Sequence, residues 1–276
     1  MIAKSKIKME IIKSNIRYYY SKLFTKTSDV IPVQLASRIF HFSLDDCNFF
    51  VQQLKNNKLN SIFETKTLEI LKEWHDQYGI VVSLYLQEDL SFLNKYIDEF
   101  NKNANWLRIS YHGIGDKKRG IDNFFYSAQN LKLNNLDYVP RLDYFHASLL
   151  DCKLLKKHGC LGFLGCDDWS YNKEKRKSNY YLKNSQNELL DRVKIIYDKD
   201  HSLYFFKTDF RLEQINQRWG SSYGAIKFIQ QNKFNENCII FSHESIFDKF
   251  SKEAEELFKW AIKDGYIFDF PMNLIK

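Results

Sequence analysis

Short apolar runs alternate with longer amphipathic stretches along the chain. Runs rich in β-branched and aromatic residues predict strands at 38–44, 80–86, 106–112, 138–145, 160–166, 202–208, 238–243 and 266–270. Apolar residues at helical spacing predict helices over 65–79, 148–159 and 251–265, each of which ends at a Gly. A strand followed by a helix, repeated along the chain, predicts an α/β fold in which parallel strands form a (β/α) barrel.

The composition indicates one folded domain with a short arm. The chain has 276 residues, of which 44% are hydrophobic and 27% are charged. It contains 10 Gly and 3 Pro, and neither a Ser/Gly-rich linker nor an internal repeat is visible. We therefore expect an N-terminal arm over 1–30 and a single domain over 31–276.

The positive charge of the chain is concentrated in the arm. Residues 1–26 contain seven Lys and Arg and one Glu, so they account for six of the seven net positive charges. The nearly neutral body argues against a nucleic-acid-binding protein. Ile12, Ile16 and Leu23 lie at helical spacing with Lys13 and Arg17 nearby, which predicts a basic amphipathic helix. This helix either packs on the body or contacts an anionic membrane surface.

The cysteine pattern favours a reducing compartment. The five cysteines are odd in number, form no Cys-x-x-Cys pair and lie mostly in apolar runs, so we expect buried free thiols. The N-terminus has no apolar core of the signal-peptide type, and no apolar stretch is long enough to span a membrane. These features predict a cytoplasmic protein, peripheral at the inner membrane face if the arm binds there.

Acids, histidines and an arginine follow or end the predicted strands. They are Asp45 and Asp46, His112, Arg141, Asp167 and Asp168, and His243. In parallel barrels the C-terminal ends of the strands meet at one rim, so these side chains should converge. Adjacent carboxylates such as Asp45 and Asp46 repel each other in a buried place, unless a cation lies beside them. The pattern therefore predicts a site that holds positive charge.

Five short motifs in this order resemble those of the polysaccharide deacetylases, the family-four carbohydrate esterases with a NodB-homology domain. They are FSLDD (42–46), HGIGD (112–116), RLDY (141–144), DDW (167–169) and FSH (241–243). The resemblance covers roughly residues 38–245 and implies a distorted (β/α)7-type barrel. It also implies a metal-dependent hydrolase that removes acetyl groups from an N-acetylated sugar of a cell-surface glycan or its precursor.

The resemblance implies a role for each catalytic position. Asp45 would be the general base, and Arg141 would pair with it and fix its orientation. His243 would be the general acid that protonates the leaving amine, helped by the carboxylate of Asp168 or Asp167.

Two aromatic residues would contact the substrate. The backbone N–H near Tyr144 would hold the oxyanion, and Trp169 would line the sugar site.

The metal set departs from the family pattern. We expect one divalent ion held by Asp46, His112 and Asp116, where Asp116 takes the place of the second family histidine. A set with two carboxylates shifts the preference from zinc toward manganese or magnesium, although the residues do not distinguish among the three. In the alternative, Asp116 caps a helix, and His146 or a water completes the site. Two further departures are Asp143 in place of Pro and Gly165 in place of Asp.

Two other functions remain compatible with these residues. The loss of the second metal histidine is compatible with an inactive barrel that binds carbohydrate or a protein partner. The same scaffold also supports hydrolysis of another C–N bond in a small amide, because function depends on the site and not on the fold.

Overall fold

The structure is a computed structural model that describes residues 26–34, 38–56, 58–87, 90–113, 118–167, 179–231 and 237–275. The predicted helical arm lies outside the described residues up to position 25. Asp116, Asp168 and Trp169 also lie outside them.

The larger of two sheets is parallel throughout. Its strand order is β4-β3-β2-β9-β8, and β10 pairs with the start of β2. The strands are β2 (Ile39–Asp45), β3 (Val82–Leu86), β4 (Leu107–Tyr111), β8 (Phe210–Arg211), β9 (Cys238–His243) and β10 (Ile267–Phe268). Five of the eight predicted strands belong to this sheet, with ends that differ by a few residues at most. They are those predicted at 38–44, 80–86, 106–112, 238–243 and 266–270.

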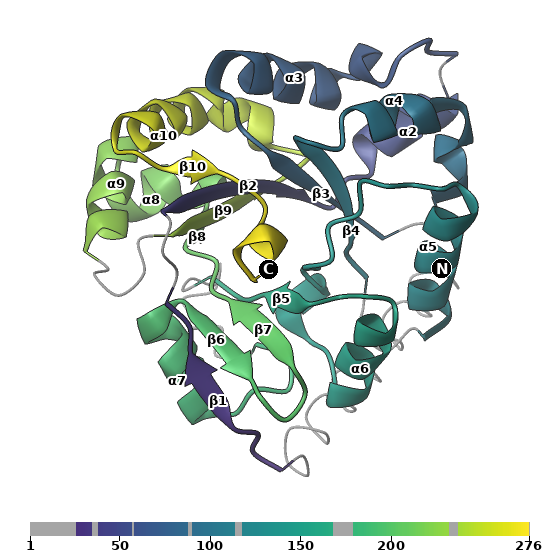
Figure 1. The fold of residues 1–276 in the computed structure, drawn as a ribbon. Coiled ribbons are helices and arrows are strands. Elements are labelled where there is room, and N and C mark those ends of the chain that lie inside the picture. Colours follow the sequence, from purple (N-terminus) through teal and green to yellow (C-terminus); the bar gives the residue numbers. More distant parts are fainter. Residues whose placement is uncertain are drawn as a thin grey trace, which may run out of the picture.

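The second sheet is mixed. Its order is β1-β6-β7-β5, where β5 runs parallel to β7 while β6 is antiparallel to both β7 and β1. The strands are β1 (Val30–Pro32), β5 (Gly162–Leu164), β6 (Ile195–Asp198) and β7 (Leu203–Phe206). Figure 1 shows this sheet facing the larger one across the centre of the molecule. Among the described residues the two sheets do not join into a closed barrel, so the fold is α/β and mostly parallel, and the predicted barrel is not confirmed.

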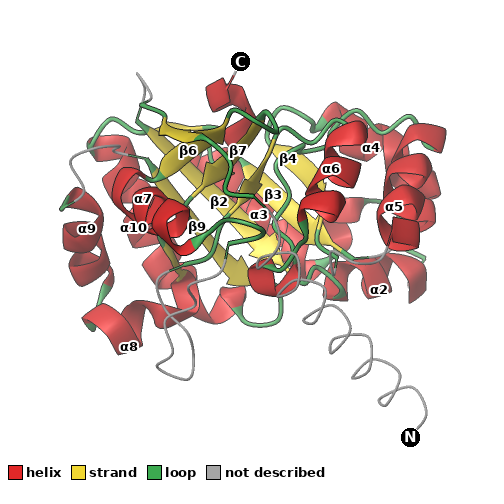
Figure 2. Ribbon diagram, turned by 90° about the horizontal axis from the view of Figure 1, so that it is seen from below, coloured by secondary structure: helices red, strands yellow, loops and turns green. Residues whose placement is uncertain are grey.

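The helices lie around the outside of the sheets (Figures 1 and 2). They are α2 (Phe49–Asn56), α3 (Lys66–Tyr78), α4 (Ile97–Lys102), α5 (Lys118–Asn130), α6 (Leu149–Lys157), α7 (Asn184–Val193), α8 (Ile215–Trp219), α9 (Ser222–Gln230) and α10 (Ser251–Lys263). Short 3₁₀ segments are η1 (Ile62–Glu64), η2 (Leu90–Tyr96), η3 (Asp143–Phe145), η4 (Leu212–Gln214), η5 (Phe247–Phe250) and η6 (Pro271–Ile275).

Local signals in the sequence set the ends of the predicted helices. The Thr65 side chain accepts the backbone N–H of Leu68 at the start of α3, which ends at Gly79 with φ 72°. Ser148 forms a capping box with Asp151 at the start of α6. These contacts confirm the helices predicted over 65–79 and 148–159.

The strand predicted over 138–145 is wrong. This segment has no strand, and the chain near it makes only an isolated bridge between Ile109 and Leu136. Pro140 has no N–H to donate to a ladder, and Tyr144 and Phe145 both have positive φ angles near 55°. The segment instead forms a loop that ends in η3 and carries Arg141 into the interior.

Alternation along β2 divides apolar from polar side chains. Every residue of β2 is buried. The rings of Phe40 and Phe42 pack edge-on against Phe258 of α10. The alternate residues His41, Ser43 and Asp45 point to the other face, because side chains alternate along a strand. The interior between the sheets therefore holds polar groups, and β2 delivers Asp45 at its C-terminal end.

All five cysteines are buried free thiols, as predicted. Burial raises the pKa of Cys47 and Cys238 well above the usual range, so these thiols stay protonated. Within the described parts of the chain, no helix combines the length and the apolar character needed to cross a membrane.

Candidate active site

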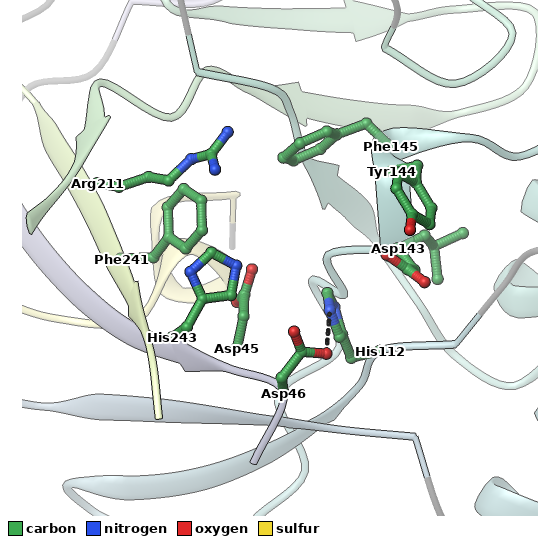
Figure 3. Close-up of a pocket in the computed structure, with 10 residues that line it drawn as sticks. Asp45, Asp46, His112, Asp143, Tyr144, Phe145, Arg211, Phe241 and His243 are labelled. Carbon is green, nitrogen blue, oxygen red and sulfur yellow. Dashed lines mark ion pairs between the residues drawn. The ribbon is translucent and has the colours of Figure 1, made fainter. Parts of the chain in front are cut away.

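A small, polar cavity lies where the C-terminal ends of β2, β4 and β9 meet (Figure 3). Its volume is about 160 Å³. The lining residues are Asp45, Asp46, His112, Leu142, Asp143, Tyr144, Phe145, Arg211, Phe241 and His243. The strand ends therefore converge, and several residues selected from the sequence share one cavity.

Asp45 is held by a fully buried arginine. Nη1 of Arg141 lies 2.8 Å from a carboxylate oxygen of Asp45 and 3.0 Å from Oγ of Ser43. Nη2 donates to Oγ1 of Thr208 at 3.2 Å, and the guanidinium lies 4.1 Å from the centre of the Phe241 ring. These contacts fix the Asp45 carboxylate and compensate its charge. The predicted contact between Asp45 and Arg141 is present.

His112 and Asp46 form a second pair in the cavity. Nδ1 of His112 donates to the carbonyl oxygen of Arg141 at 2.5 Å, so Nε2 is directed at Asp46, 3.6 Å away. Burial opposes protonation of His112, but the carboxylates of Asp45 and Asp46 outweigh it and raise the pKa of His112 to about 9. The neighbouring His112 ring in turn lowers the pKa of Asp46.

The third pair joins His243 to a carboxylate that the sequence did not single out. Nδ1 of His243 lies 2.6 Å from Oε1 of Glu213, and Oγ of Ser242 donates to Oε2 of Glu213 at 3.0 Å. Burial alone would lower the pKa of His243, but the hydrogen bond and the charge of Glu213 raise it above its usual value.

Of the two carboxylates expected to help His243, Asp167 does not contact it. The Asp167 carboxylate is bound to Arg211 and to Gln214. The other candidate, Asp168, lies outside the described residues. Glu213 was missed because it follows β8, which is only two residues long and shows no strand pattern.

Asp143 and Tyr144 form the wall beside His112 (Figure 3). Burial raises the pKa of Asp143 above its usual value. The role expected for a backbone N–H near Tyr144, to hold the oxyanion, stays a prediction. The Tyr144 ring is about half exposed at the cavity mouth, where a substrate can reach it. His146, the alternative metal ligand, is not among the residues that line this cavity.

Glu244 connects the C-terminal end of β2 to the start of α2 through hydrogen bonds. Its backbone N–H donates to the carbonyl of Asp45 at 3.0 Å. Its carboxylate accepts the N–H groups of Phe49 and Phe50 at the start of α2 and the hydroxyl of Thr67. The Glu244 side chain therefore lies at the start of α2 and is buried.

The fit to a metal ion is partial. Asp46 offers a carboxylate, and His112 offers Nε2 with its other nitrogen fixed by a carbonyl, as is usual for a metal-binding imidazole. The described residues contain no group of three or more His, Cys, Asp or Glu side chains arranged to hold a metal. The predicted third ligand, Asp116, is outside them, as is Trp169.

Comparison with known proteins gives a distant structural likeness and no match in sequence. No protein-family model matches the chain, and a search of curated proteins finds no significant match. Among solved structures, the chain is similar to a "putative polysaccharide deacetylase" from Mycobacterium smegmatis, with a TM-score of 0.47 and 10% sequence identity. The match covers 83% of this chain and 89% of the other. At this level of similarity it assigns no activity to the chain.

Proposed function

We propose that the chain is a metal-dependent hydrolase that removes an acetyl group from the nitrogen of an N-acetylated sugar. The observation that supports this best is that a carboxylate and a histidine, a candidate base and a candidate acid, lie side by side in one cavity. Asp45 and His243 are register partners on the adjacent strands β2 and β9. Each is oriented by its own buried partner, Arg141 for Asp45 and Glu213 for His243.

The two groups suit the two proton transfers of amide hydrolysis. Water that attacks the amide carbon must lose a proton, and the departing nitrogen must gain one. In the proposal Asp45 accepts the first proton, and protonated His243 donates the second. Arg141 fixes the orientation of the Asp45 carboxyl group throughout. Glu213 holds the His243 ring with Nδ1 bound, which leaves Nε2 as the nitrogen that delivers the proton.

The proposed ion and substrate contacts follow the sequence prediction. Asp46, His112 and Asp116 would hold one divalent ion, which polarises the amide carbonyl and lowers the pKa of a bound water. Tyr144 at the cavity mouth and Trp169 would contact the sugar. We also propose that the two sheets form an open, distorted barrel of the deacetylase type.

Acetate release from a matched panel tests the function. The panel contains N-acetylglucosamine oligosaccharides, their O-acetylated but N-free counterparts, and simple amides such as acetamide. Release from the N-acetylated sugars alone supports the proposal. Release only from simple amides indicates the other C–N hydrolase, and sugar binding without any release indicates a binding protein.

The metal ligands can be tested without an assay of activity. In Asp116→Ala we expect the affinity for Mn²⁺ or Zn²⁺ to fall at least about tenfold, because a ligand carboxylate is lost. The measurement is metal stoichiometry of the purified protein together with titration calorimetry. The matched control is Asp122→Ala, whose carboxylate binds His158 away from the cavity. Unchanged stoichiometry and affinity in Asp116→Ala would remove this residue from the ligand set.

The pH dependence of kcat should report His243. Because Glu213 raises its pKa, His243 stays protonated to higher pH than an ordinary histidine, and activity should fall as pH rises through that pKa. In Glu213→Gln the pKa falls, so the alkaline limb of the kcat profile should move to lower pH. Profiles measured at saturating substrate decide this, and a limb that does not move contradicts the role of His243 as the acid.

The N-terminal arm remains a proposed membrane contact. Each basic residue near an anionic surface contributes about 1 kcal/mol, so the full chain should co-sediment with phosphatidylglycerol vesicles and lose this binding at high salt. Vesicles of phosphatidylcholine alone provide the control. Equal binding by a chain that lacks residues 1–26 contradicts the proposal and leaves packing on the body as the role of the arm.

A further inference from the structure

Asp167 holds both sides of the segment that carries Glu213. This aspartate follows β5 and is almost completely buried. It accepts hydrogen bonds from Nε and Nη2 of Arg211 at 2.9 and 3.0 Å, and from Nε2 of Gln214 at 3.0 Å. Arg211 precedes Glu213 by two residues, and Gln214 follows it directly. One carboxylate from a different part of the chain therefore fixes the segment at both ends.

The segment lies between the two-residue strand β8, which pairs with β9, and the short helix α8. It is the single 3₁₀ turn η4, three residues long, and its first position has no side-chain cap. A turn of this length does not maintain a fixed direction by its own hydrogen bonds. Nδ1 of His243 donates to Glu213 at 2.6 Å, and hydrogen bonds weaken steeply with distance and angle, so a displacement of the turn weakens this one.

The negative charge of Asp167 also affects which carboxylate Arg211 binds. The guanidinium of Arg211 lines the cavity (Figure 3). It interacts electrostatically with Asp167 and also with Glu213. A bidentate carboxylate is a better partner for a guanidinium than a carboxylate already bound to a histidine and a serine. With Asp167 in place, Glu213 stays available to His243. The other acids that face His243 are Asp45 and Asp46.

We infer that Asp167 is a positioning residue for the Glu213–His243 pair. By binding Arg211 and Gln214 it holds Glu213 against His243, and it keeps Arg211 from drawing the Glu213 carboxylate away. Asp167 thus acts on His243 through intermediate side chains and without direct contact. The effect on catalysis rests on the proposed function, whereas the effect on the hydrogen bond does not.

A double-variant cycle tests the catalytic effect. In Asp167→Asn we expect kcat for acetate release to fall about tenfold with KM within about twofold, because the acid is misplaced while the cavity remains. In a Glu213→Gln background the same substitution should cost nothing further. A purely structural role predicts the same loss in both backgrounds, and that result overturns the inference. Asp191→Asn is the control, since its carboxylate binds Lys207 outside the cavity and should leave kcat unchanged.

A spectroscopic measurement tests the positioning without any substrate. The Nδ1 proton of His243 in its hydrogen bond to Glu213 should give a low-field proton NMR resonance, assigned by its absence in His243→Gln. This resonance should disappear or broaden in Asp167→Asn and persist in Asp191→Asn. An unchanged resonance in Asp167→Asn overturns the inference even if no acetate is released from any sugar. If Asp167→Asn does not fold, Gln214→Met removes one of its hydrogen bonds and is judged by the same two measurements.

Discussion

Asp45→Asn should lower kcat for acetate release by at least about a hundredfold. The amide cannot accept the proton of the attacking water, while its size and its contact with Arg141 are largely preserved. KM should change little, because Asp45 lies at the end of a buried strand and is not at the cavity mouth. The measurement is steady-state kinetics at several pH values, so that a shifted optimum is not mistaken for a loss.

The control for this variant is Asp122→Asn. Asp122 also pairs with a basic side chain, His158, at 2.8 Å, but it lies on α5 away from the cavity. It should retain wild-type kcat. Near-normal turnover in Asp45→Asn excludes Asp45 as the base, and equal losses in both variants indicate a general effect of removing an ion pair.

Arg141→Met should lower the free energy of unfolding by about 3–5 kcal/mol. The substitution keeps a long side chain in a fully buried place but leaves the Asp45 carboxylate without its cation. Ser43 and Thr208 lose a donor as well. Urea unfolding followed by circular dichroism measures the change.

A control variant at the surface and a double variant separate the effect of the buried charge from the effect of packing. Lys72→Met removes an exposed pair with Asp76 and should change the free energy of unfolding by less than about 0.5 kcal/mol. Adding Asp45→Asn to Arg141→Met removes the unpaired buried charge and should recover part of the loss. A double variant as unstable as Arg141→Met alone contradicts this electrostatic account.

The parallel strands could be predicted because their signal is local. Residues 80–86 form a nearly continuous apolar run, and 38–44 and 238–243 are short stretches rich in apolar residues, as expected for buried strands. The antiparallel strand β6 could not be predicted in the same way. It follows α7 directly, and the helix ends at Lys194, which adopts φ 64° where a Gly would normally mark the stop. Without that Gly, no boundary between helix and strand is visible.

The residues of the candidate site also divide into those with a local sequence signal and those without one. Asp45, Asp46, His112 and His243 end strands that the pattern identifies, so their convergence follows from the geometry of parallel sheets. Glu213 sits on a turn after a two-residue strand, and its role depends on contacts with His243 and Ser242 across the fold. Such contacts have no periodicity in the sequence. Asp143 was noticed only as a departure from a motif, and its place in the cavity wall came from the structure.

The most direct test of the central claim is hydrolysis of an N-acetylglucosamine oligosaccharide in ¹⁸O-enriched water, with Mn²⁺ or Zn²⁺ supplied. The account predicts free acetate that carries one ¹⁸O atom, because water supplies the new oxygen when the C–N bond breaks, together with an equal amount of free amine on the sugar. Asp45→Asn, treated in the same way, should produce almost none. No acetate from the wild-type protein, or acetate formed equally by both proteins, contradicts the account.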